Sequence, residues 1–245
     1  SVNVVIVWYG GYLYLNHGAS IGDIMAFQWY TFLLLNPLWN IVNSLSELQR
    51  SLAVAGEVVA LGHADGGDFN QPEALLAQVK AIAPQVIVNA AAYTAVDRAE
   101  SESDTCFAVN ERGTGYLSEA AESVGAHFVA VSTDYVFDGT SDRPYLETDP
   151  TNPLSVYGRS KLAGERRCRP HDTIVRTSWV MGLRGRNVLH VIADRVASGS
   201  PVRFVTDQMG PPTFSADLAR GIATFIRKRP GGIWHFANQP ATSWY

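Results

Sequence analysis

Segments typical of β-strands and α-helices alternate along the chain from about Glu47 onward. Strand patterns occur in EVVAL, QVIVNAAA, HFVAVST and TIVRTSWV. Helical patterns occur in SELQRSLAVAG, PEALLAQVKAIAP, and the stretches from about Cys106 to Ser123, Val156 to Arg167 and Asn187 to Ala197. This alternation is typical of parallel sheets covered by helices. The sequence therefore predicts an α/β fold with a doubly wound parallel sheet, whose ligands lie at the carboxyl ends of the strands.

The first 46 residues differ from the rest in composition. Apart from a histidine, Asp23 is the only acidic or basic residue before Glu47. The uncharged run from Ile24 to Ser46 is long enough to cross a hydrocarbon layer of about 30 Å as a helix. Its polar residues and Pro37 are costly in lipid, so a buried amphipathic element is the alternative. We therefore divide the chain into an apolar segment, residues 1–46, and an α/β domain, residues 47–245.

Composition excludes several classes of protein. A net charge of -4 and a pI near 5.8 give no sign of the basic surface that a nucleic-acid-binding protein needs. Cys106 and Cys168 are far apart and lack CxxC spacing, so we expect neither a disulfide framework nor a zinc site. No Lys or Arg precedes the first apolar run, so a signal peptide is not indicated and a cytoplasmic location is expected.

The strongest chemical motif is YGRSK, with Tyr157 and Lys161 four residues apart. This spacing places a phenol and an ammonium on one face of a helix. A nearby positive charge favours the phenolate, which would allow the tyrosine to exchange a proton with a carbonyl or alcohol oxygen. The isolated motif also occurs in many helices as a solvated pair.

Two strand ends precede this motif. HFVAVST ends in Ser132 and Thr133, at the edge where a hydroxyl could meet Tyr157, although a Ser/Thr turn is the alternative. VIVN ends at Asn89 and is followed by alanines, which would let the ribose and nicotinamide of a cofactor approach the backbone. Close packing against a helix would explain these small residues equally well.

Five stretches in sequence order carry a family resemblance: NAAAYTAVDRAES, STDYVFDG, NPLSVYGRSKLAGE, RTSWV and VTDQMGPPT. They resemble the dTDP-4-dehydrorhamnose reductase family of extended short-chain dehydrogenases, over about Glu47 to Tyr245. The resemblance implies a Rossmann-like fold and hydride transfer from NADPH or NADH to the 4-keto group of a dTDP-6-deoxy sugar, in dTDP-rhamnose biosynthesis. It also raises a homodimer and a Mg²⁺ requirement as family features, with no residue here assigned to the metal.

The resemblance also implies roles for individual residues. Tyr157 would donate the proton, Lys161 would lower its pKa and hold the nicotinamide ribose, and Thr133 would hydrogen-bond the substrate carbonyl. The cofactor-binding residues would be Asp68, Asn89, Ala90, Ala91, Tyr93 and Lys161. The substrate-binding residues would be Thr133, Asp134, Trp179, Gln208 and Thr213. A core aromatic residue and a proline-rich turn are the alternatives for Trp179 and for the segment from Gln208 to Thr213. The loop GHADGG, which contains His63, does not select NADPH or NADH.

The chain departs from the family pattern at both ends. The family begins with a strand and a Gly-rich loop that receives the pyrophosphate, but Gly10, Gly11, Gly18 and Gly22 lack GxxGxxG spacing. The stretch from Trp8 to Ile41 instead resembles a transmembrane segment of an ABC exporter. We therefore expect the first strand and loop to be replaced, and hypothesise a join of two unrelated coding segments at ELQRSLA. The final residues, HFANQPATSWY, predict a truncated substrate lobe.

Three other functions stay open. A catalytically silent binding or regulatory subunit would fit the lost Gly-rich loop, although Thr133, Tyr157 and Lys161 are intact. A membrane-transport fragment with a reductase-like tail would fit residues 1–46, through which alone membrane contact is expected. An epimerase or dehydratase of the same fold is the third, because Asp134 follows Thr133.

Overall fold

A parallel sheet forms the centre of the computed structural model, which describes residues 58–61, 72–182, 187–205 and 207–243. Within these ranges the sheet has five strands in the order β1-β2-β3-β4-β8, and all neighbouring pairs are parallel. The strands are β1 (Val58–Leu61), β2 (Val86–Asn89), β3 (His127–Thr133), β4 (Thr173–Thr177) and β8 (Gly232–His235). The predicted α/β class and parallel sheet are confirmed.

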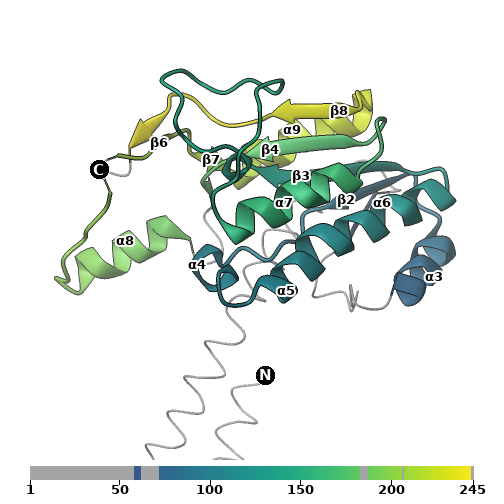
Figure 1. Ribbon diagram of the computed structural model, residues 1–245, viewed down its shortest axis with the longest axis horizontal. Coiled ribbons are helices and arrows are strands. Elements are labelled where there is room, and N and C mark those ends of the chain that lie inside the picture. The colour runs from purple at the N-terminus through teal and green to yellow at the C-terminus, as the bar shows by residue number, and fades with distance from the viewer. Residues whose placement is uncertain (1–57, 62–71, 183–186, 206, 244–245) are drawn as a thin grey trace, which may run out of the picture.

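Helices cover both faces of the sheet, as Figure 1 shows. On one side lie α3 (Pro72–Ile82), α6 (Thr114–Ser123) and α7 (Val156–Arg167), and on the other lies α9 (Ser215–Lys228). The strand residues alternate accordingly, since side chains along a strand point to opposite faces. Ile87, Phe128 and Ala130 pack with α3 and α6, whereas Val88 and Val129 pack with α9. The sheet is therefore buried on both faces, as expected for parallel strands.

The predicted element bounds agree best around the YGRSK motif. The strand HFVAVST and the helix from Val156 to Arg167 have the predicted limits, as β3 and α7. The helix from Cys106 to Ser123 is present as α5 (Ser103–Phe107), a π-helical segment η2 (Ala108–Gly113) and α6. The short helix α4 (Val96–Ala99) precedes α5.

Two predicted strands were wrong in extent. QVIVNAAA is a strand only as far as Asn89, and TIVRTSWV is interrupted after Thr177. The chain turns at Trp179, whose φ is +44°, before the short strand β5 (Val180–Met181). A positive φ is costly for a bulky side chain, which is why the β-forming pattern did not reveal this turn.

The C-terminal part adds elements that the strand and helix patterns above did not include. The chain from Ser215 forms α9 and then β8, which pairs with β4. Two small pairs also occur there: β5 with β7 (Thr213–Phe214), and β6 (Met209–Gly210) with β9 (Thr242–Ser243). The predicted helix α8 (Val188–Ala197) is present but buries none of its residues, and Figure 1 shows it set apart from the sheet.

The predictions made for the start of the chain concern residues that lie outside the described ranges. These are the exporter-like segment, the replaced first strand and the helix SELQRSLAVAG. None of the helices within the described ranges is long and apolar enough to cross a membrane. Both cysteines are free thiols, which agrees with the expectation that they form no disulfide.

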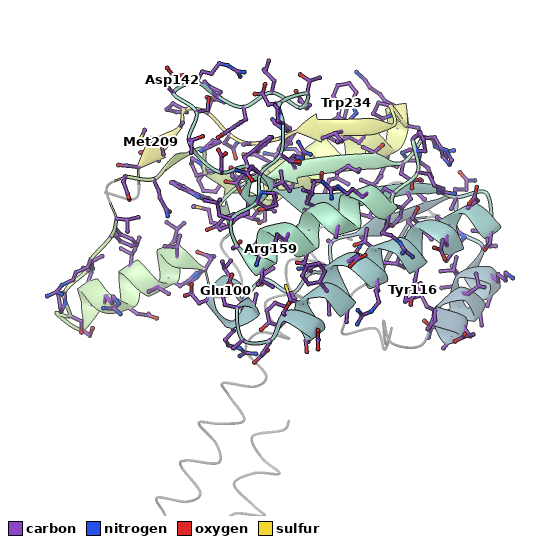
Figure 2. The ribbon with its side chains drawn as sticks, viewed as in Figure 1. Glu100, Tyr116, Asp142, Arg159, Met209 and Trp234 are labelled. Carbon is purple, nitrogen blue, oxygen red and sulfur yellow. The ribbon has the colours of Figure 1, made fainter. Side chains whose placement is uncertain are left out.

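Two features anchor the first turn of α7, which carries Tyr157. The Ser155 side chain accepts a hydrogen bond from Gly158 N at 3.0 Å, as a helix N-cap residue does. The carboxylate of Glu100 accepts from Val156 N at 2.8 Å, where a negative charge also favours the helix dipole. Glu100 and Arg159, a residue of this helix, are both labelled in Figure 2. The start of α7 is therefore held from outside the helix.

Gly158 is expected to tolerate no larger side chain. A Cβ at this position would lie 2.3 Å from the backbone oxygen of Tyr135, which cannot move like the end of a side chain. We expect Gly158→Ala to lower the free energy of unfolding by about 1–3 kcal/mol, despite the better helix propensity of alanine. Urea denaturation would measure this difference.

Gly115 on α6 provides the matched control for Gly158→Ala. A Cβ there would meet the flexible side chain of Arg167, with its Nε at 2.8 Å, instead of backbone. Gly115→Ala should therefore leave stability unchanged or raise it. An equal loss of stability in both variants would contradict the proposed close approach of α7 to Tyr135.

Candidate active site

Thr133, Tyr157 and Lys161 come together where β3 ends. Thr133 is the last residue of β3, while Tyr157 and Lys161 lie on successive turns of α7, which packs against that strand. All three are buried, with 6%, 9% and 6% of their surface exposed. The Thr133 side chain lies near enough to the phenol to act on the pKa of Tyr157. The three predicted catalytic residues therefore form one group at the carboxyl edge of the sheet.

The Tyr157 phenol is protonated before any ligand binds. Burial raises the pKa of Tyr157 well above its ordinary value, and the nearby Thr133 side chain opposes this shift only in part. The nearby Asp134 carboxyl raises the pKa further. The net shift is therefore upward, in contrast to the lowering by Lys161 that the family resemblance implied. A neutral phenol is the form that can donate a proton.

Lys161 is a buried cation with one well-defined contact. Its Nζ donates to the backbone oxygen of Val131 at 2.7 Å. Burial lowers the pKa of Lys161 from 10.5 to about 8, and the charge of Glu165 opposes this shift. Lys161 is therefore charged at neutral pH but sensitive to the charges around it.

Lys161 should make stability depend on alkaline pH. Its folded-state pKa is depressed, so the unfolded chain binds the proton more tightly. The contribution of Lys161 to the free energy of unfolding should therefore rise as pH increases from about 8 to about 10.5. We expect Lys161→Met to remove this rise. Urea denaturation at several pH values measures the difference between variant and parent, and parallel curves would contradict the depressed pKa.

Asp134 and Tyr135 follow Thr133 in a short 3₁₀ turn, η3 (Asp134–Val136). Thr133 Oγ1 donates to Asp134 Oδ1 at 3.1 Å and accepts from Tyr135 N at 3.3 Å. Burial raises the pKa of Asp134. The Tyr135 ring meets the Tyr157 ring edge-on, with centroids 5.5 Å apart. Tyr135 was not predicted, although it lies within the STDYVFDG motif.

The predicted cofactor-binding residues continue along the same edge of the sheet. Asn89 ends β2 and pairs in register with Ala130 of β3. Its amide donates to Thr114 Oγ1 at 3.1 Å and accepts from Ala91 N at 3.1 Å, so it fastens the turn that follows β2. Ala90 and Ala91 follow Asn89, with Ala91 packed into the core on the side of α3 and α6 and Ala90 packed against the core on the side of α9. Asp68 and His63 lie outside the described residues.

Asn110, which the sequence interpretation missed, joins this turn to α7. It is 1% exposed and lies in the π-helical segment η2. Its Oδ1 accepts from Tyr93 N at 2.8 Å, and its Nδ2 donates to Tyr93 O at 3.1 Å and to Ser160 Oγ at 2.9 Å. π-Helical turns often mark functional sites, but no sequence pattern predicts them. Asn110 thus couples the cofactor edge to the helix of Tyr157 and Lys161.

The predicted substrate-binding residues divide into two groups. Trp179 and Thr213 are joined, because Thr213 N donates to Trp179 O at 3.2 Å where β5 pairs with β7. The Trp179 ring lies against Gly210, so the RTSWV stretch and the QMGPPT segment meet. Thr213 is fully buried and bonds Thr177, whereas Gln208 is exposed. Thr213 therefore holds the segment in place from within.

No metal site accompanies these residues. Within the described ranges, no group of three or more His, Cys, Asp or Glu side chains is arranged to hold a metal ion. The Mg²⁺ requirement raised by the family resemblance therefore has no support from this part of the chain.

Comparisons with known proteins agree with this geometry. The family model described as the RmlD substrate binding domain matches residues 45–245. The dTDP-4-dehydrorhamnose reductase of Burkholderia thailandensis is 43% identical over 211 residues, which cover 81% of this chain and 70% of that protein. None of the matches supports the likeness of the first 46 residues to an ABC exporter.

Solved structures show the same relationship. A dTDP-4-dehydrorhamnose reductase from Clostridium acetobutylicum superimposes with a TM-score of 0.77 and 36% identity, covering 82% of this chain and 72% of that one. The Bacillus anthracis dTDP-4-dehydrorhamnose reductase in complex with NADP superimposes with a TM-score of 0.70 and 35% identity, covering 72% and 64%. On the extent of the family match and the identity of these relatives, this chain belongs to the dTDP-4-dehydrorhamnose reductase family.

Proposed function

We propose that this chain reduces the 4-keto group of a dTDP-6-deoxy sugar, dTDP-4-dehydro-rhamnose, with NADPH or NADH, and so serves dTDP-rhamnose biosynthesis. The observation that carries the proposal is the buried Tyr157 phenol, which lies near Thr133 at the end of β3 and is followed one helical turn later by the Lys161 cation. Its relatives are named dTDP-4-dehydrorhamnose reductases.

The protein would contribute position and a proton. Thr133 and Tyr157 present two hydroxyls side by side, which suits them to hold one substrate carbonyl oxygen between them. Thr133 also bonds Asp134, so its orientation is restricted. Tyr157 would give its proton to that oxygen, and the Lys161 ammonium would stabilise the phenolate left behind. The nicotinamide, when bound, supplies the hydride to the carbonyl carbon.

The residues that would hold the nicotinamide end of the cofactor are Asn89, Ala90, Ala91, Tyr93 and Lys161. Their fit rests on the small side chains after β2 and on the cation at the neighbouring strand end. We assign Asp68 to the adenine end by family resemblance. Binding of NADP by the Bacillus anthracis relative supports a nicotinamide dinucleotide, and both NADPH and NADH remain part of the proposal.

The sugar nucleotide would lie beyond the carboxyl ends of β3 and β4. We assign Thr133, Asp134, Trp179, Gln208 and Thr213 to this region. Asp134, Trp179 and Gln208 are the members with exposed surface, whereas Thr213 would support Trp179 through their backbone hydrogen bond. An epimerase or dehydratase is the runner-up within this fold, because the half-buried Asp134 is a second group that could exchange protons.

A titration of the purified chain with NADPH and NADH, followed by an assay with the 4-keto sugar nucleotide, tests the proposal. We expect micromolar binding and oxidation of the cofactor, with dTDP-rhamnose as the product. A different sugar product would favour the epimerase or dehydratase. A folded chain that binds neither cofactor would favour the silent binding subunit, the alternative suggested by the missing GxxGxxG spacing.

Residues 1–46 raise a separate proposal. Their lack of charge favours membrane contact through this segment alone, with the reductase domain, from residue 47, in the cytoplasm. Dependence of solubility on detergent in the full chain, and its loss in a chain that starts at residue 47, would support this assignment. Light scattering of the same samples would test the homodimer.

A further inference from the structure

Three consecutive residues at the end of β3 contact one face of α7. Val131 accepts from Lys161, Ser132 donates to Glu165, and Thr133 lies near Tyr157. The three helix residues are four positions apart, so they lie one above another on the same face. Glu165 therefore continues the row of the two predicted catalytic residues, one turn further along the helix.

Glu165 is held from two strands at once. Its Oε1 accepts from Ser132 Oγ of β3 and from Arg176 Nε of β4 at 3.0 Å, and its Oε2 accepts from Arg176 Nη2 at 2.7 Å. Ser132 and Arg176 are partners in the register of these strands. The Glu165 and Arg176 side chains are each only 4% exposed. A buried bidentate pair of this kind fixes geometry as well as charge.

The buried Glu165 carboxylate affects the pKa of Lys161. The Glu165 carboxylate is the largest of the charges that oppose the depression of the Lys161 pKa by burial. The other titratable groups that act on Lys161 are Cys168, the C-cap residue of α7, and Cys106 on α5. Arg176, on β4, holds Glu165 through two of its nitrogens, so the carboxylate cannot swing away from the sheet.

We propose that Glu165 is a positioning residue, which Ser132 and Arg176 hold so that its carboxylate keeps Lys161 charged and keeps the Tyr157–Lys161 face of α7 aligned with the end of β3. The effect on catalysis rests on the proposed reductase function. The effect on the charge of Lys161 does not, and it can be measured without cofactor or substrate.

The lysine content of the chain makes this measurement direct. The sequence contains three lysines, Lys80, Lys161 and Lys228, and the two others are exposed. Lysine labelled with ¹³C at Cε should therefore give three NMR signals, and Lys161→Arg assigns the buried one. Lys80 and Lys228 act as internal references in the same pH titration.

In Glu165→Gln the titration midpoint of Lys161 should fall by about one pH unit or more, because an attractive charge is lost. Glu165→Asp keeps the charge and should retain most of the parent value. A folded Glu165→Gln whose Lys161 midpoint matches that of the parent would overturn the proposal. Should this variant fail to fold, Glu165→Gln/Arg176→Met removes both charges of the buried Glu165–Arg176 pair, and its Lys161 midpoint should also lie below that of the parent.

The pH profile of kcat separates this proposal from the proposed function. In a chain that turns over, Glu165→Gln should move the alkaline limb of the profile to lower pH by the same amount, with little change in KM. A purely structural role would lower stability and leave that limb in place. A shifted Lys161 midpoint in a chain without turnover would support the role of Glu165 while contradicting the reductase function.

Discussion

Tyr157→Phe is expected to lower kcat by about 10²- to 10⁴-fold, the range for loss of a general acid. In the proposed mechanism the phenol donates to the substrate oxygen, and its pKa, raised by burial, keeps it protonated until the reaction. The ring would remain, with its edge-on contact to Tyr135 at 5.5 Å between centroids. Cofactor affinity, measured by fluorescence titration, should therefore stay near the value of the parent.

Tyr116→Phe is the matched control for this prediction. Tyr116 lies on α6 and packs against the core on the α3 side, away from the start of α7 in Figure 2. Tyr116→Phe also removes one phenol hydroxyl, but at a position outside the candidate active site, so turnover should be unchanged. A Tyr157→Phe variant that retains parental turnover would show that the proton comes from another group.

Arg176→Met should lower the free energy of unfolding by about 3–5 kcal/mol, because it leaves a buried carboxylate without its charged partner. Arg176 and Glu165 are both 4% exposed and joined by two short hydrogen bonds. The guanidinium also lies over the Phe137 ring, 5.1 Å from its centroid, and this contact would be lost as well. Urea denaturation would measure the loss.

Arg98→Met tests whether burial of the ion pair is the cause of the stability loss expected for Arg176→Met. The Arg98–Glu102 pair has a distance of 3.3 Å, but its side chains are 68% and 41% exposed. Exposed pairs contribute about 0–1 kcal/mol, so this variant should be close to the parent. Glu165→Gln/Arg176→Met, which removes both buried charges, should recover part of the stability lost by Arg176→Met. Equal losses from the exposed and the buried arginine would contradict the argument.

The buried Glu165–Arg176 pair contacts the helix that carries the predicted catalytic residues, so substitutions in the pair are expected to affect both stability and turnover. This helix carries Tyr157 at its start, Lys161 in its middle and Glu165 near its end, and all three lie beside the end of β3. Removal of Arg176 should therefore loosen the same helix face that the reaction needs. We expect destabilising substitutions here to affect kcat as well as the unfolding transition.

Local patterns in the sequence were sufficient for the elements that surround the site. Alternation of strands and helices predicted the parallel sheet, because each element needs an apolar face and the period of that face is visible in a short window. The i, i+4 spacing placed Tyr157 and Lys161 on one helix face, and the strand end placed Thr133 at the correct edge. β3 and α7 have the predicted limits for this reason.

The remaining features depend on contacts between distant parts of the chain. Glu165 and Arg176 are 11 residues apart, and Asn110 and Ser160 are 50 apart, so no local period pairs them. The register of β3 against β4 sets Ser132 beside Arg176, and only then can both reach one carboxylate of α7. The turn at Trp179 likewise requires the neighbouring strand pair β5 and β7. The sequence by itself thus determined the class of fold, which follows from local periodicity. Its motifs, through the family resemblance, selected the three predicted catalytic residues, whereas tertiary packing decided which buried charges lie beside them.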